Sequence, residues 1–512
     1  MRFHRESRQD AYDVIVVGAG IGGLSAAALL ARAGRSVLVV ERHDRPGGYA
    51  HSFRRGRYRF DSAVHLVGGC EPVPFEGGGL IHQLLETLEV RERCHFERID
   101  PCYTALYPGL EVEAPCDLED FVAAHLEHFP RERKGLRQLV QECLNIRVES
   151  RNSAELATPF DVMRTPNRFP TLLRYRRATL ADALGDFLED PRLASAFSTL
   201  WPYLGLPPSR VSFLYFATML MSYIADGAYY CRGSFQSFAN ALVEALESAG
   251  GELLLRSPVR RIRVEDGRAR GIVLENGQRV DAGVVISNAD LLQTVDELVG
   301  PAAFERRWVA GLRRMRPSIS AFVVYAATDL DVAALGVGHE SFVYQSWDHD
   351  EAYRSVLAGD PSWLSVTVPS LADPGLAPPG EHLVTLTTLL PYDAVPSWRA
   401  EKHRRAERML HCAEQRLPGL RDHLRFAESG TPRTMERYTR NSAGAIYGWE
   451  LAPRQVGPRR PGHLTPIDGL YLAGHWAQPG GGIYGVVTSG VRAAQEVLGY
   501  ERERSLWNAL AR

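Results

Sequence analysis

The sequence predicts an α/β protein with a βαβ unit near its start and a second, α+β domain. Three observations support this prediction. Residues 12–52 have the pattern strand, glycine-rich turn, helix and strand; similar buried strand patterns return at 251–290 and 469–490; and residues 300–430 alternate like an antiparallel sheet. At 512 residues, the chain is too long for one core and is expected to hold two domains.

The composition excludes several classes of protein. With 45% hydrophobic and 23% charged residues, the chain resembles an ordinary globular protein. The 59 Lys and Arg residues balance the 61 Asp and Glu residues, and no basic stripe with aromatic residues occurs, so no nucleic-acid partner is expected. Seven scattered cysteines without a CxxC pair argue against a disulfide framework or a zinc site. We therefore expect no metal and a reducing, cytoplasmic location.

Membrane contact is expected to be peripheral at most. Residues 1–11 are charged and lack the apolar segment of a signal peptide. No stretch approaches the ~18 uninterrupted apolar residues of a spanning helix. Residues 163–177 carry five arginines and no acid. This run could contact anionic lipid at the inner face of the membrane, although a solvated protein face is the commoner explanation.

The stretch 12–52, YDVIVVGAGIGGLSAAALLARAGRSVLVVERHDRPGGYAHS, contains one complete βαβ unit. Residues 12–17 are a β-branched apolar run typical of a strand buried on both faces. An Ala/Leu-rich helix is expected over 24–32 and a second strand over 36–40. The helix would begin directly after the first strand, where its unpaired N–H groups and partial positive charge favour a phosphate.

Gly18, Gly20 and Gly23 form a G-x-G-x-x-G motif between the strand and the helix. We expect Gly18 to permit a tight turn, Gly20 to admit a pyrophosphate, and Gly23 to let the helix pack on the strand. Glu41 follows Gly23 by 18 residues, where its carboxylate can accept hydrogen bonds from ribose hydroxyls and would repel a 2′-phosphate. The flanking elements favour a dinucleotide site over a glycine-rich turn in an ordinary α/β protein.

A second glycine pair, Arg45-Pro46-Gly47-Gly48, suits another close approach of the backbone to the same ligand. With this pair, the stretch resembles the flavin-dependent amine oxidase and phytoene desaturase superfamily, in which the motif continues as E-x(4)-P-G-G and the ligand is FAD. The resemblance implies a Rossmann-like FAD-binding domain of the discontinuous glutathione-reductase type. Its parts would be residues 11–75, 236–298 and 431–500, with a mainly helical substrate region at 76–235 and a substrate domain with an antiparallel sheet at 299–430.

Residues 53–69 suggest strands around a turn and contain two polar residues of interest, Asp61 and His65. In the resembled superfamily this segment passes close to the flavin ring. Two interpretations stay open: the two residues face the pocket, or they form a satisfied, buried Asp–His pair.

The middle of the chain is expected to build the substrate region. Helical patterns cover 80–88, 118–128, 134–148 and 180–188. The apolar run 211–225 is either a buried helix, which we favour, or the wall of a long tunnel for a hydrocarbon. Tyr229 and Arg232 lie in the turn that follows. In the superfamily such a turn leads from the substrate region back to the flavin domain.

Strand patterns return at 252–255, 261–264, 271–274 and 284–289. They match the superfamily pattern S-P-V-x-x-I … A-D-x-V-I-S-N-A, which implies that Val259 holds the adenine edge through its backbone. Further strands are expected at 319–326, 363–368 and 382–389, and a long helix at 398–415. No second glycine triad follows a strand in this part, so no dedicated NAD(P) domain is expected.

Residues 469–490 are expected to form a strand, a glycine-rich loop and the start of a helix. In the superfamily this loop carries the flavin ring over the helix N-terminus, whose N–H groups stabilise a reduced flavin. The loop and residues 439–450 resemble the bacterial carotenoid isomerase and retinol saturase branch. The resemblance assigns FAD contacts to Gly18, Gly20, Gly22, Gly23, Glu41, Arg42, Gly47, Gly48, Val259, Gly474, Gly481, Gly482, Ile483 and Val486.

FAD would carry the redox step, and the protein would orient the substrate. A desaturase also needs a base, for which His65 or His475 could serve because histidine titrates near neutral pH; either could equally be a packing residue. Tyr447 is the third catalytic candidate. The remaining candidates for the substrate pocket are Asp61, Tyr229, Arg232, Trp476, Gln478 and Tyr484.

The leading hypothesis is an FAD-dependent oxidoreductase acting on C=C bonds of a long apolar polyene or isoprenoid, by desaturation, saturation or isomerisation. NADH or NADPH could act as an external reductant. The alternative within the same scaffold is an NAD(P)H-dependent reductive cyclase of a polyene tetramate macrolactam. A flavin amine oxidase and a non-catalytic prenyl-lipid carrier are weaker alternatives, the latter because every glycine of the nucleotide motif is intact.

Overall fold

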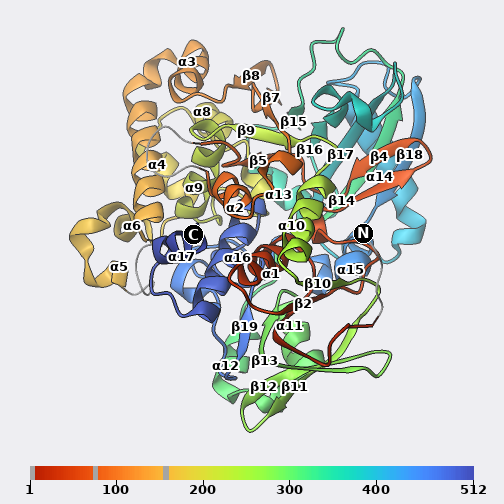
Figure 1. The fold of residues 1–512 in the computed structure, drawn as a ribbon. Helices are drawn as coiled ribbons and strands as arrows, with labels where there is room; N and C mark the ends of the chain where they lie inside the picture. Colours follow the sequence, from red (N-terminus) through yellow and green to blue (C-terminus); the bar gives the residue numbers. More distant parts are fainter. Residues whose placement is uncertain (1–5, 73–78, 154–160, 512) are drawn as a thin grey trace.

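The computed structural model describes residues 6–72, 79–153 and 161–511. Two seven-stranded sheets organise the fold. Figure 1 shows the first sheet at the bottom, the second at the upper right, and a group of helices at the upper left. The predicted α/β class with a second, α+β part is confirmed. The predicted boundary between residues 75 and 76 lies outside the described residues, and the division into domains stays a prediction.

The first sheet collects strands from three distant segments of the chain. Its order is β10-β2-β1-β13-β12-β11, and β19 pairs with β13. The strands are β1 (Ala11–Val17), β2 (Val37–Val40), β10 (Glu252–Leu254), β11 (Val259–Glu265), β12 (Arg268–Leu274), β13 (Arg279–Ser287) and β19 (Leu470–Leu472). β1, β2, β10 and β19 pair in parallel, and the β11–β12 hairpin extends the sheet antiparallel. This arrangement brings the carboxyl ends of β1, β2 and β13 to one edge.

Helix α1 (Ile21–Arg32) follows β1 directly and is buried at every residue before Arg32. It packs against α10 (Gln236–Ser248) and α16 (Ile483–Leu498). Small residues allow this close packing, because a Cβ atom on Gly490 of α16 would lie 2.3 Å from the Gly22 carbonyl oxygen. The first glycine motif is therefore fixed from both sides by helices.

The second sheet has the order β18-β14-β17-β16-β15-β7-β8. Its strands are β7 (Tyr103–Tyr107), β8 (Leu110–Ala114), β14 (Ser320–Thr328), β15 (Glu340–Tyr344), β16 (Trp363–Thr367), β17 (His382–Leu390) and β18 (Leu424–Gly430). All pairs are antiparallel except β15 with β7. β7 and β8 come from the region expected to be mainly helical. These two short strands meet at a turn in which Gly109 takes a φ of 78°, and they complete the sheet across a long sequence separation.

The helical group consists mostly of residues 80–224. It contains α2 (Leu80–Thr87), α3 (Leu118–His128), α4 (Arg133–Ser153), α5 (Asp161–Arg164), α6 (Pro170–Tyr175), α7 (Leu180–Phe187), α8 (Pro191–Phe197) and α9 (Phe213–Ile224). The five arginines of the basic run are all exposed and lie in or next to α5 and α6, which are at the left of Figure 1. They are Arg164, Arg168, Arg174, Arg176 and Arg177. Among the described helices, none is long and apolar enough to cross a membrane.

Smaller elements join the two sheets. β3 (Ser52–Arg55) and β4 (Tyr58–Asp61) form a hairpin, and β5 (Val67–Gly68), β9 (Ala228–Cys231) and β6 (Phe96–Ile99) form a three-stranded sheet. The remaining helices are α11 (Leu291–Gln293), α12 (Arg306–Leu312), α13 (His349–Leu357), α14 (Trp398–Ala413), α15 (Pro432–Thr439) and α17 (Glu503–Leu510).

Candidate active site

A continuous cavity of about 650 Å³ connects the glycine motifs of the first sheet to the face of the second sheet. At one end its wall is made by the loops that follow β1, β2 and β13. At the other end it is made by β14, β15, β16 and β17, together with Pro202 and Tyr203. No residue of 211–225 lines this cavity, and the apolar face of α9 is buried in the core, so this segment is a buried helix.

The first glycine motif leaves no room for side chains. Gly18 has a φ of 99°, which favours glycine. A Cβ atom on Gly20 would lie 2.8 Å from Asn288 Nδ2, and one on Gly22 would lie 2.9 Å from Gly474 Cα. Gly20, Ile21 and Gly22 also line the cavity at the start of α1, and the first N–H groups of this helix lack partners within the helix. This cradle fits the pyrophosphate of the expected FAD.

Glu41 lines the cavity at the end of β2. Its carboxylate accepts hydrogen bonds from the backbone N–H groups of Ala19 and His43, both at 2.8 Å. The second glycine pair lies beside the first motif, because the Gly47 N–H donates to the Ala19 carbonyl at 2.7 Å. The two glycine segments therefore form one surface next to a carboxylate, which is the arrangement expected for the diphosphate and ribose.

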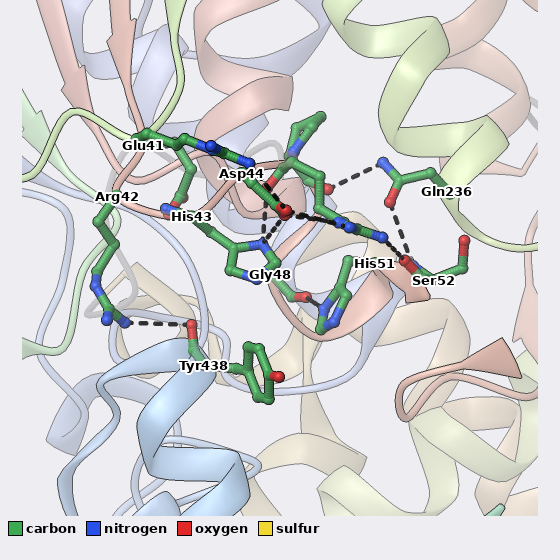
Figure 2. Close-up of polar contacts among 12 residues, drawn as sticks. Glu41, Arg42, His43, Asp44, Gly48, His51, Ser52, Gln236 and Tyr438 are labelled. Atoms are coloured by element: carbon green, nitrogen blue, oxygen red, sulfur yellow. Dashed lines mark hydrogen bonds and ion pairs between the residues drawn. The ribbon is translucent and has the colours of Figure 1, made fainter. Parts of the chain in front are cut away.

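The loop that carries Gly47 and Gly48 is anchored from several directions (Figure 2). Arg45 donates to the Ser52 carbonyl at 2.7 Å, and Gln236 Nε2 donates to the Pro46 carbonyl at 3.0 Å. His51 Nδ1 donates to the Gly48 carbonyl at 2.7 Å. Burial lowers the pKa of His51 to about 4, so this imidazole is neutral at physiological pH. These contacts hold the backbone of the loop in place, and the His51 contact does so without a charge.

Most of the residues assigned to FAD line the cavity. They are Gly18, Gly20, Gly22, Glu41, Arg42, Gly47, Gly48, Val259, Gly474, Gly482, Ile483 and Val486. Gly23 and Gly481 do not, and each instead permits close packing. A Cβ atom on Gly23 would lie 2.4 Å from the Gly18 oxygen, and one on Gly481 would lie 3.0 Å from Tyr447 Cα. α16 begins at Ile483, so its N-terminus faces the cavity as expected for the flavin ring.

Asn288 and Asp290 follow β13 and line the cavity, but neither was singled out from the sequence. Asn288 Nδ2 donates to the Gly18 carbonyl at 3.2 Å, which ties the β13 end to the first glycine turn. Asp290 accepts from the Gln293 and Ser442 N–H groups, and its burial raises its pKa. The sequence signal that could have identified both residues is their position directly after a buried strand that is parallel to β1.

Arg460 is a buried cation in contact with residues 475–477 of the glycine-rich loop, and no sequence pattern pointed to it. Its guanidinium donates to the carbonyl oxygens of Tyr447, Trp449, His475 and Ala477. Burial lowers its pKa to about 10, so it remains charged at neutral pH. It joins the segment 447–449 to the segment 475–477 and adds a positive charge next to them.

His65, His475 and Tyr447 all line the cavity. Burial lowers the pKa of both histidines to about 3, so both are neutral at physiological pH. His475 Nε2 donates to Asn441 Oδ1 at 3.3 Å. The Tyr447 hydroxyl donates to the Pro202 carbonyl at 3.1 Å, and burial raises its pKa. These neutral groups can therefore orient a ligand through hydrogen bonds, and the lowered pKa makes both imidazoles weak bases.

The six further pocket candidates lie outside the cavity wall. Asp61 is buried against Tyr230 and the Phe235 N–H, and Tyr229 is buried in the three-stranded sheet. Arg232 is 47% exposed and lies 4.0 Å from the Glu97 carboxylate.

Packing fixes the other three. Trp476 Nε1 donates to Asn441 Oδ1 at 2.9 Å, and its ring packs edge-on against Trp449. Gln478 donates to the Arg460 carbonyl at 2.9 Å. Tyr484 points from α16 toward Gly69, whereas its neighbours Ile483 and Val486 line the cavity. The helical turn thus places adjacent residues on different faces.

Comparisons with known proteins show what the chain as a whole is similar to. A family model described as flavin containing amine oxidoreductase matches residues 21–498. Prolycopene isomerase 2, chloroplastic, from an Oncidium hybrid cultivar is 30% identical over 97% of this chain and 86% of its own length. Phytoene desaturase (neurosporene-forming) from Rhodobacter capsulatus is 29% identical over 94% and 93%. An oxidoreductase structure from Methanosarcina mazei matches with a TM-score of 0.66 over 94% of this chain and 99% of that chain, at 20% identity, which bears on the fold alone.

Proposed function

The chain belongs to the flavin-containing amine oxidoreductase family, and we propose that it acts on carbon–carbon double bonds of a long, largely apolar polyene or isoprenoid. It is an FAD-dependent oxidoreductase. The observation that carries the proposed substrate class is the cavity itself. It leads from the FAD cradle, past Ile446, Tyr447 and Ile483, to a sheet face with Val323, Phe342 and Leu389. An elongated apolar molecule would bury its surface along this wall.

When bound, FAD supplies hydride or electron transfer at carbon. The chain's own residues do the rest. Glu41 and the two glycine segments would bind the nucleotide, and the N–H groups at the start of α16 would stabilise negative charge on a reduced ring. Arg460 adds a fixed positive charge behind the same loop. The buried wall would exclude water from the reacting carbons, and the neutral imidazoles of His65 and His475, which their lowered pKa makes weak bases, would orient the ligand.

Two of the relatives support this proposal from two directions. One is a prolycopene isomerase and the other a phytoene desaturase, and both align along nearly the whole chain. Neither is a reductive cyclase, so the tetramate macrolactam alternative gains no support from them. The flavin spectra described next distinguish the two directions of electron flow, from NAD(P)H to the flavin or from the polyene to the flavin.

The test is the visible flavin spectrum of the purified protein, recorded before and after anaerobic addition of NADH or NADPH. Rapid bleaching would favour a saturase, a reduced-flavin isomerase or the reductive cyclase. A flavin that stays oxidised with NAD(P)H but bleaches with a partly saturated polyene would favour a desaturase. The proposal would be contradicted if none of the polyenes tested reacted with either the oxidised or the reduced flavin.

We further propose peripheral contact with anionic lipid on the cytoplasmic side of the membrane, through the exposed arginines of α6 and the turn after it, Arg174, Arg176 and Arg177. The protein should sediment with phosphatidylserine vesicles and not with phosphatidylcholine vesicles. Reversing the charge of Arg174 and Arg176 to Glu should abolish sedimentation and leave the flavin spectrum unchanged. Equal sedimentation with both vesicles would contradict membrane contact through these arginines.

A further inference from the structure

The wall that the second sheet gives to the cavity is partly polar. Strand pairing places Val323, Thr387, Ser365 and Phe342 side by side in one row across β14, β17, β16 and β15. All four line the cavity. Directly paired residues on one sheet face have Cβ atoms about 5 Å apart. Thr387 and Ser365 therefore place two hydroxyl groups side by side in the middle of this wall. For a pure hydrocarbon substrate, apolar side chains would be expected at these positions.

Three residues that line the cavity carry a buried polar atom without a hydrogen-bond partner among the described residues. These atoms are Tyr203 Oη, Trp363 Nε1 and Thr387 Oγ1. Trp363 is only 3% exposed, so water does not reach it freely. A buried polar group without a partner costs about 1–3 kcal/mol. A ligand that supplies the missing partners would remove this cost.

The next row on the same face is polar throughout. It consists of Tyr325, Thr385, Thr367 and Glu340. Thr367 Oγ1 donates to Glu340 Oε2 at 2.7 Å, whereas Glu340 Oε1 has no partner among the described residues. Burial raises the pKa of Glu340 to about 8, and the hydrogen bond from Thr367 offsets this only in part. The carboxyl is therefore neutral at pH 7 and can act as a hydrogen-bond donor.

The available groups define the chemistry of the missing ligand atom. The Trp363 indole can only donate, so the ligand must offer an acceptor. Neither row contains a cationic side chain. A carboxylate would bring a buried charge without a counter-charge from these rows, which is strongly unfavourable. A hydroxyl or carbonyl oxygen meets both conditions.

We propose that the pocket formed by Tyr203, Trp363, Ser365 and Thr387 binds a hydroxyl or carbonyl oxygen on the otherwise apolar substrate. This inference rests on the proposed function and narrows its substrate class to oxygen-bearing polyenes or isoprenoids. Binding of this oxygen fixes how far the substrate enters the cavity and so selects which of its double bonds lies beside the flavin.

The test compares two probes that differ by one oxygen: retinol, and the hydrocarbon with hydrogen in place of its hydroxyl group. Binding to the FAD-loaded protein is followed by quenching of tryptophan fluorescence. Retinol should bind at least about tenfold more tightly, because a site with unpaired donors discriminates against a ligand without the matching group. Thr387→Val should weaken retinol binding about fivefold and leave the hydrocarbon unaffected. Equal binding of both probes to the wild type, or equal loss of both in the variant, would overturn the proposal.

A second measurement needs no ligand. Thr387→Val removes an unpaired buried hydroxyl and should raise the melting temperature of the protein without substrate. The matched control, Thr367→Val on the neighbouring strand, removes the partner of Glu340 and should lower it. The same direction of change in both variants would contradict the unpaired state of Thr387. Because none of these measurements requires turnover, they separate this inference from the proposed activity, which the flavin spectra test.

Discussion

Tyr230 donates a hydrogen bond from its phenolic hydroxyl to Asp61 Oδ2 at 2.5 Å. The Phe235 N–H donates to Asp61 Oδ1 at 2.9 Å. The pair joins the β3–β4 hairpin to β9 and to the start of α10, and it replaces the Asp–His pair that the sequence left open. Burial raises the pKa of Asp61 to about 7, although both donors act in the opposite direction.

The first prediction is a pH dependence of stability that Asp61 causes. A raised pKa means that the folded protein keeps a proton that the unfolded chain releases above about pH 4. The stabilisation is complete below that pH and is lost as the pH rises through about 7. Asp61→Asn should remove this loss, which amounts to at most ~4 kcal/mol. Urea unfolding at pH 5.5 and 8.5 covers about half of this pH range and should show a difference of ~2 kcal/mol. Asp393→Asn, at an exposed position, is the control; an unchanged pH slope in Asp61→Asn would disprove the assignment.

The second prediction concerns the first glycine turn. Gly20→Ala places a Cβ atom 2.8 Å from Asn288 Nδ2, the amide that donates to the Gly18 carbonyl. We expect the Kd for FAD to rise at least tenfold, or ~1.4 kcal/mol. FAD titration of the apoprotein by fluorescence measures this. Gly283→Ala, at a position with open space around it, should leave the Kd unchanged. A variant that retains full FAD affinity would show that the turn has room for a side chain.

The third prediction concerns the buried guanidinium. Arg460→Met leaves four backbone carbonyls without their donor and should reduce the free energy of unfolding by more than ~3 kcal/mol. Arg460→Lys keeps the charge but has fewer hydrogen-bond donors, so its free energy of unfolding should lie between those of the wild type and Arg460→Met. Arg454→Met, at an exposed position nearby, should change stability by less than ~0.5 kcal/mol. Similar melting temperatures for Arg460→Met and Arg454→Met would contradict the structural role of Arg460.

The fourth prediction concerns the two cavity histidines. With pKa values of about 3, neither His65 nor His475 should titrate between pH 6 and 9. The rate of flavin reduction or oxidation is followed by stopped-flow absorbance as a function of pH. Its profile should show no inflection near pH 6.5 caused by either histidine, so His65→Gln and His475→Asn should not change the shape of the profile in this range. An inflection removed by one of these substitutions would identify that histidine as an acid or base that titrates when substrate binds.

The sequence alone determined the nucleotide-binding half of this protein. The strand, turn, helix and strand of residues 12–52 depend on contacts between near neighbours, because period-two and period-3.6 patterns and glycine spacing are local properties. Residues that act through the backbone, such as Gly18 and Gly474, could be named because close approach requires glycine whatever surrounds it.

Only the tertiary structure decided which side chains face the cavity. Asp61 and Tyr484 look like pocket residues from their motifs, yet long-range partners turn them away from it. Thr387 and Ser365 looked like ordinary alternating strand residues until the register of β17 against β16 set them side by side in the wall. Arg460 acquired its role from four carbonyls on two other segments. The physical reason is that the direction of a side chain is local, whereas the surface that it meets is assembled from segments far apart in the chain.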